Sequence, residues 1–152
     1  MRLIKSTLLL AATLPLASAA FAQCETEAAS LKTINAQKTY AEAMAKKSQD
    51  ESKAALAAIR AKATQLGWND ARLNTYMTGL SANTTLTRLE TQKKTAMEKM
   101  RAARAVMAQR KESEGVPALC KDVVKMAVHG NEVLKTAMEQ AMYMKTLPAD
   151  MK

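Results

Sequence analysis

The chain has 152 residues and a formal net charge of +9, and 48% of its residues are hydrophobic but only 3% are aromatic. Alanine, lysine, methionine and other good helix formers dominate, and glycine and proline are scarce. This composition predicts an all-α protein rather than a sheet-based fold. The scarcity of aromatic side chains, on which bases would stack, argues against a nucleic-acid partner.

The first 22 residues have the three regions of a secretory signal peptide. Two cations precede a short apolar stretch at residues 8–16, and Ala20-Phe21-Ala22 fits a small-x-small cleavage site. We therefore predict cleavage before Gln23 and a single mature domain, residues 23–152, in the periplasm or outside the cell. No second apolar run follows, so no transmembrane segment is expected in the mature chain.

The first predicted helix covers residues 26–66. Its packed face is marked by residues that recur at steps of three, four and seven, namely Leu31, Ile34, Ala41, Ala45, Ser52, Leu56, Ile59, Ala63 and Leu66. Ser48 and Glu51 have the spacing of a capping box, so the sequence leaves open a break near the middle of this helix. Gly67 is expected to end it, with Trp68 folding back onto the last turn.

Three further helices are predicted along the rest of the chain. A short helix, capped by Asn69 or Asp70, runs to about residue 80, and a long helix follows at about 85–114. The long helix has a heptad seam formed by Leu86, Leu89, Ala96, Met100, Ala103 and Met107. Pro117 suits the first position of the last helix, which is expected to run to about residue 146. Gly130 is a weak point within it, because glycine is a poor helix former.

The expected architecture is an elongated, coiled-coil-like antiparallel bundle of three long helices and one short helix. Short connections make neighbouring helices antiparallel, so the first and last long helices start at the same end. Cys24 precedes the first helix and Cys120 lies in the first turn of the last, which predicts a Cys24–Cys120 disulfide. A lipid-modified Cys24 is an alternative, although Gln23 stands where lipoprotein processing favours glycine or alanine.

Few residues in the sequence suggest catalysis. The single histidine, His129, lies about two helical turns from Cys120, whereas nucleophilic catalysis needs a histidine beside the nucleophile. No glycine-rich phosphate loop, zinc-binding HExxH motif or calcium loop occurs in the sequence. We therefore expect no enzyme activity and no cofactor.

Methionine is unusually frequent, with 11 residues in the chain. Methionines can fill gaps in a core, or they can form an adaptable apolar binding surface. A third interpretation is copper binding, because thioethers suit Cu(I). The candidate ligands for that metal site are Met126, His129, Met138 and Met142.

The stretch from Arg88 to Lys111 holds eight cations and two carboxylates. Helical spacing places cations on both flanks of the heptad seam, and a solvated face is the simplest interpretation. We instead predict a docking surface formed by Arg88, Lys93, Lys99, Arg104 and Arg110.

The sequence thus predicts an exported, basic helical binding protein that acts as an adaptor or chaperone. Its partner would be an anionic envelope component or an anionic protein, and copper binding is the alternative function. In composition and export signal the chain is similar to the basic, aromatic-poor helical chaperones of the bacterial periplasm. The oligomeric state is left open, a homo-oligomer included.

Overall fold

The computed structural model describes residues 23–152, so the predicted signal peptide at 1–22 lies outside the described residues. The helices of this part of the chain are α2 (Glu27–Gln65), α3 (Asp70–Gly79), α4 (Thr84–Ala108) and α5 (Gly115–Met144). Short 3-10 turns accompany them, namely η1 (Leu80–Ala82), η2 (Glu112–Glu114) and η3 (Leu147–Asp150). No strand occurs between residues 23 and 152, and the prediction of an all-α fold with three long helices and one short helix is confirmed.

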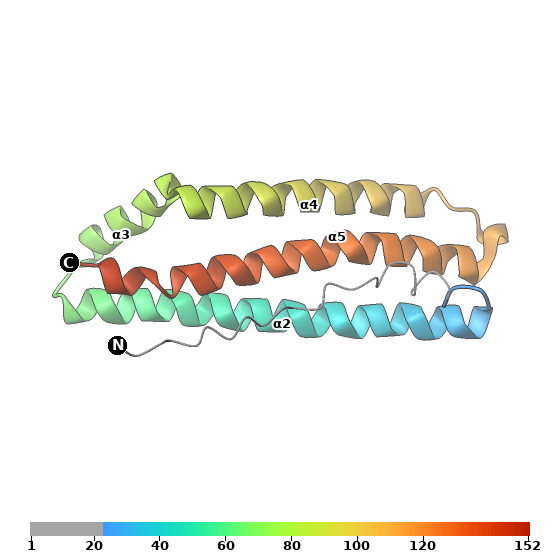
Figure 1. Ribbon diagram of the computed structural model, residues 1–152, viewed down its shortest axis with the longest axis horizontal. Coiled ribbons are helices and arrows are strands. Elements are labelled where there is room, and N and C mark those ends of the chain that lie inside the picture. Colours follow the sequence, from blue (N-terminus) through green and yellow to red (C-terminus); the bar gives the residue numbers. More distant parts are fainter. Residues whose placement is uncertain (1–22) are drawn as a thin grey trace, which may run out of the picture.

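The three long helices lie side by side, with α5 between α2 and α4 (Figure 1). Both outer helices pack against α5, whereas α2 and α4 hardly touch each other. Cys24, just before α2, is bonded to Cys120 near the start of α5, and Glu51 in the middle of α2 pairs with Lys145 just after α5. The helices α2 and α5 therefore run parallel, and α4 runs antiparallel to both.

The ends of α2 follow local sequence signals. The Thr26 hydroxyl accepts a hydrogen bond from the Ala29 N–H and caps the first turn. At the other end Gly67 adopts a φ of 69°, which a residue with a side chain rarely takes. The Trp68 N–H then reaches back to the Ala63 carbonyl at 3.0 Å. This is the predicted Schellman motif, in which the turn satisfies carbonyls that the helix end leaves free.

Helix α2 is continuous, so the break left open near Ser48 does not occur. Ser48 is buried, and its carbonyl accepts a hydrogen bond from the Ser52 hydroxyl within the helix. The predicted packed face is wrong at Leu31, which is 48% exposed, and at Ala45, which is also exposed, while Ser30 and Thr33 are buried. The disulfide holds two Cα atoms 5.7 Å apart at this end, which leaves room for small rather than large side chains between the helices.

The third long helix is shorter than predicted, because α4 ends at Ala108 instead of continuing to about residue 114. Lys111 is extended, and its N–H donates to the Glu114 carboxylate at 3.0 Å. Helix α5 then begins at Gly115, whose φ of 74° turns the chain, rather than at Pro117. The predicted weak point at Gly130 does not interrupt α5.

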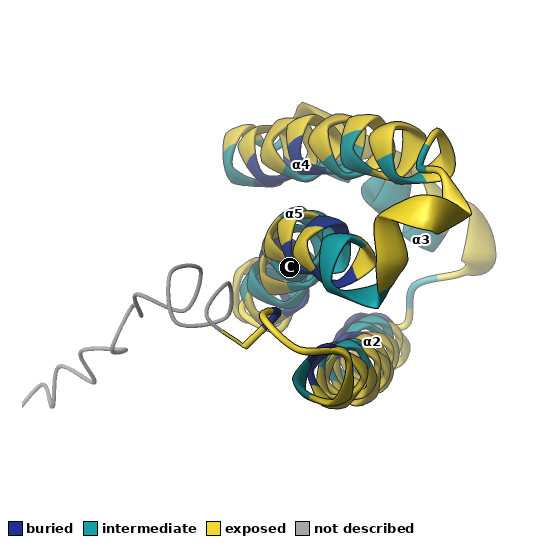
Figure 2. Ribbon diagram, turned by 90° about the vertical axis from the view of Figure 1, so that its right-hand side faces the viewer, coloured by how far each residue is buried: buried dark blue, intermediate teal, exposed yellow. Residues whose placement is uncertain are grey.

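Two apolar clusters stabilise opposite ends of the molecule. The larger one lies where the end of α2, helix α3, the start of α4, the end of α5 and η3 meet. Its buried members are Ile59, Ala63, Leu86, Leu147 and Met151. Burial and the charge of nearby Asp150 raise the pKa of Tyr76, which packs against this cluster. The smaller one contains Cys24, Cys120 and Val124. Figure 2 shows that the outward faces of α2 and α4 are largely exposed.

Candidate docking surface on α4

Helix α4 packs against α5 and, at its start, against η1, so much of its remaining surface is free. The predicted heptad seam is the side that it buries: Leu86, Leu89 and Ala96 are buried, and Met100, Ala103 and Met107 are half-buried. Asn83 sets the beginning of the helix, because its side-chain oxygen accepts the Leu86 N–H at 3.1 Å. Most of the remaining residues of α4 face solvent, so a charged side chain among them is accessible to a partner.

Three of the five predicted docking cations are exposed. Arg88 donates a hydrogen bond to Gln92 at 3.2 Å, which leaves its charge uncompensated. Lys99 and Arg104 are exposed and form no ion pair within residues 23–152. These three side chains therefore keep their positive charge available at the surface.

The other two predicted docking cations are engaged inside the bundle. Lys93 is half-buried, pairs with Glu90 at 2.5 Å and donates to the Gln140 amide oxygen of α5 at 3.3 Å. Arg110 pairs with Glu114 at 2.5 Å and with Asp122 at 2.5 Å. These contacts join α4, or the link that follows it, to α5.

Two exposed cations that the prediction did not include, Lys94 and Arg101, also lie on α4. They are seven residues apart, so they share one edge of the helix. Neither forms an ion pair in the described part of the chain. The seven-residue spacing was visible in the sequence, but only the structure shows that this edge is free.

The exposed cations of α4 form two edges on either side of its seam. On one edge, Arg88 donates a hydrogen bond to Gln92. Gln92 and Thr95 line a hollow that is also lined by Glu132 and Glu139 of α5. Lys94 lies on the other edge, beside Leu86, Glu90 and Met144. We name these the Arg88 edge (Arg88, Lys99) and the Lys94 edge (Lys94, Arg101, Arg104).

The four candidate copper ligands do not form one cluster. Met126 is 14 residues before Gln140, which contacts α4, and His129 is seven residues after Asp122, which contacts Arg110 in the link after α4. Met138 lies seven residues before Lys145, which contacts α2, whereas Met142 is 50% exposed. Residues three or four apart share a helix face, so Met126 with His129 and Met138 with Met142 form two separate pairs along α5 rather than one site. Within the described chain, no group of three or more His, Cys, Asp or Glu side chains could hold a metal ion.

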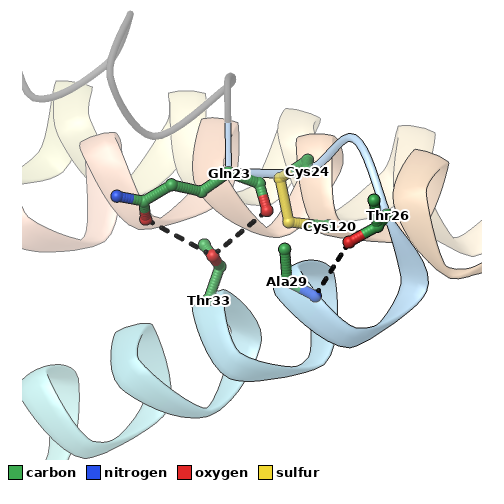
Figure 3. The surroundings of a disulfide bond; sticks show 6 residues. All are labelled: Gln23, Cys24, Thr26, Ala29, Thr33 and Cys120. Atoms are coloured by element: carbon green, nitrogen blue, oxygen red, sulfur yellow. Dashed lines mark hydrogen bonds between the residues drawn. A yellow bond between two sulfur atoms is a disulfide. The ribbon is translucent and has the colours of Figure 1, made fainter.

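The predicted disulfide between Cys24 and Cys120 is present, and both cysteines are fully buried (Figure 3). The Thr33 hydroxyl lies within hydrogen-bond distance of the Gln23 carbonyl and side-chain oxygens, at 3.5 and 3.4 Å. These contacts fix the segment before α2 against the bundle. Because both sulfurs are bonded to each other, neither cysteine is a free thiol.

None of the helices described between residues 23 and 152 combines the length and apolarity needed to cross a bilayer. In comparisons with known proteins, no family model, no curated protein and no solved structure matches the chain.

Proposed function

We propose that this chain is an exported binding protein, periplasmic or secreted, that docks an anionic partner through the exposed cations of α4. The partner would be an anionic envelope component or an acidic protein surface, and the chain would act as an adaptor or chaperone. The observation that carries the proposal is the concentration of exposed cations on a helix that packs on one side. These cations are Arg88, Lys94, Lys99, Arg101 and Arg104.

The geometry of α4 suits electrostatic docking. Arg88 and Lys99 are 11 residues apart on a rigid helix, a separation of about 16 Å along its axis. That distance exceeds the Debye length of about 8 Å at physiological ionic strength, so each cation acts nearly independently. Such charges mainly raise the association rate, and arginine can bind a phosphate or carboxylate in a bidentate manner.

The disulfide supports export. Disulfides form and persist in oxidising compartments such as the periplasm or the extracellular space. Here the bond is fully buried and joins the segment before α2 to α5, which indicates a structural role. Together with the predicted signal peptide, it favours a location outside the cytoplasm.

The test uses two variants that lose the same amount of charge. One replaces Lys94, Arg101 and Arg104 of α4, the cations of the Lys94 edge, by glutamine. The control replaces Lys32, Lys47 and Arg60, which are exposed cations of α2 without an ion pair among the described residues. Binding to phosphatidylglycerol vesicles and to polyglutamate is measured between low and physiological salt.

We expect the α4 variant to bind both polyanions at least about tenfold more weakly than the wild type, with a flatter salt dependence. The α2 variant should lose much less. Equal losses in the two variants would mean that only net charge matters, and would refute docking through α4.

A further inference from the structure

The Lys94 edge of α4 borders an apolar groove. The groove has a volume of about 440 Å³ and is built by α3 and η1, the first turns of α4 and the end of α5. Its apolar lining residues are Met77, Leu80, Leu86 and Met144. Leu86 is buried and the other three are half-buried, so their side chains remain partly accessible.

We infer that this groove and the Lys94 edge bind an acidic amphipathic helix of a partner protein. The inference rests on the proposed function and names the class of partner. Apolar side chains of the partner helix would enter the groove between Leu86 and Met144. Its carboxylates would pair with Lys94 and Arg101, which are seven residues or about 10.5 Å apart along α4. Two acidic residues seven apart on the partner helix match this spacing.

Charge distinguishes the two edges of α4. Beside the Arg88 edge, α5 presents two carboxylates, Glu132 and Glu139, and one cation, Lys135, so this edge suits an acidic partner less well. Beside the Lys94 edge, the carboxylate that lines the groove is Glu90, and Lys93 neutralises it at 2.5 Å. The apolar groove and the unpaired Lys94 therefore lie together, with Arg101 two turns further along the same edge, and this combination complements an acidic amphipathic helix.

The shape of the groove favours a helix over the other anionic partners. It is open to solvent rather than enclosed, whereas small-molecule sites bury most of their ligand. It is also concave, and Leu86 within it is buried, so a flat bilayer surface would make little contact with Leu86. Apolar anchors at positions i, i+3, i+4 and i+7 of a helix fill such grooves. Met77 and Met144 add flexible side chains that adapt to the anchors of a partner.

The probe is a fluorescein-labelled 18-residue peptide with leucine at i, i+3, i+4 and i+7 positions and glutamate on the opposite face. One comparison peptide carries lysine in place of each glutamate, and another has the acidic peptide's composition in scrambled order. Binding to the full mature domain is followed by fluorescence anisotropy. Phosphatidylglycerol vesicles and sedimentation of the protein alone test the other occupants of the groove.

Two charge-reversal variants locate the site. Lys94→Glu with Arg101→Glu alters the Lys94 edge, and Arg88→Glu with Lys99→Glu is the matched control on the other edge of the same helix. We expect the first pair to weaken binding of the acidic peptide at least about tenfold, and the control to weaken it less than about threefold. Met77→Gln, which keeps the side-chain length but makes the groove polar, should also weaken binding about tenfold, with an unchanged circular dichroism spectrum.

Four results would each overturn the inference. Equal binding of the acidic and scrambled peptides, or equal losses in both charge-reversal variants, would refute a helix-binding groove. A dimer that dissociates on Lys94→Glu with Arg101→Glu would assign the groove to a second copy of the chain. Salt-sensitive vesicle binding through α4 without peptide binding would refute the partner helix but leave the proposed function standing. If the protein bound neither the vesicles nor the peptide, both the partner helix and the proposed function would be refuted.

Discussion

Asp122 is the one buried carboxylate in the described part of the chain, with 5% of its surface exposed. A carboxylate removed from water needs a partner, and Arg110 supplies two contacts, Nε at 2.7 Å and a terminal guanidinium nitrogen at 2.5 Å. The same guanidinium group pairs with Glu114 at the end of η2. The charge of Arg110 is thus used to hold the link after α4 against α5.

Removal of Arg110 should destabilise the fold because Asp122 would remain buried without a counter-charge. For Arg110→Met we expect a loss of about 3 kcal/mol in the free energy of unfolding, measured by urea denaturation. The exposed pair of Lys46 and Asp50 provides the control, and Lys46→Met should leave the unfolding midpoint unchanged. Arg110→Met combined with Asp122→Leu should recover most of the loss. A single Arg110→Met variant as stable as the wild type would show that Asp122 is accessible to water.

Gly67 and Gly79 provide a second comparison, since a new Cβ atom meets no atom within 4 Å at either position. They differ in backbone conformation: φ is 69° at Gly67 and −63° at Gly79. Gly67→Ala should lower the free energy of unfolding by about 1 kcal/mol through backbone strain. Gly79→Ala should raise it by as much as about 1 kcal/mol, because alanine restricts the unfolded chain. Thermal denaturation tests both, and a shift of the same sign in the two variants would contradict this explanation.

At the level of secondary-structure elements, local sequence signals predict a helix boundary well where a single residue sets it. Gly67 ends α2 through its own backbone conformation, and Asn69 and Asn83 cap α3 and α4 through their own side chains. The end of α4 was mispredicted because the helix pattern continues past Ala108 without a breaker. Just after this end Arg110 pairs with Asp122 of α5, and such a cross-helix partner is invisible in a local pattern.

The candidate site shows the same limit of prediction from a local sequence pattern. Spacing along α4 identifies which cations share a face, but the partners of those cations lie on other helices. Gln140 engages Lys93 from α5, so Lys93 is tied into the bundle although the sequence placed it with Arg104. Lys94 was left out, yet it lies beside the groove. The register between two helices is set by side-chain packing, and a single sequence does not display it.

The disulfide joins two elements that have few other apolar contacts at their shared end. The cluster around it contains one further buried side chain, Val124, and the half-buried Ile34. A bond that closes a sequence separation of 96 residues should contribute as much as about 4 kcal/mol by restricting the unfolded chain.

Replacement of both cysteines by alanine should therefore lower the free energy of unfolding by as much as about 4 kcal/mol in urea denaturation. Reduction of the wild type with dithiothreitol should produce a similar loss, while the same treatment should not affect the double-alanine variant. An unchanged unfolding midpoint in both cases would show that the smaller cluster holds this end without the bond.

At the scale of the whole molecule, apolar burial is concentrated at the two ends. The cluster around Ile59 and Leu86 collects side chains from every helix, whereas the disulfide cluster is small. The seams between these ends contain buried small or polar residues such as Ala96, Thr136 and Ala141. Composition predicted the fold class, but it did not show that α5 is central or that α2 and α4 stay apart.

This uneven packing predicts an uneven pattern of amide hydrogen exchange. Local opening is easiest where few apolar contacts must be broken, so protection should follow the packing of each segment. We expect the slowest exchange in residues 55–66 of α2, which join the larger cluster, and in α5, which is covered from two sides. Residues 97–108 of α4, which pack on one side only, should exchange faster.

Reduction of the disulfide separates the contributions of the two ends. Residues 27–44 of α2 should then lose protection, because Cys24 no longer holds their start against α5. Residues 55–66 should keep theirs, because the larger cluster does not involve the bond. Exchange followed by mass spectrometry of proteolytic peptides resolves these segments. Equal loss of protection along the whole of α2 would mean that its two ends unfold as one cooperative unit, and the fold would then depend on the disulfide throughout.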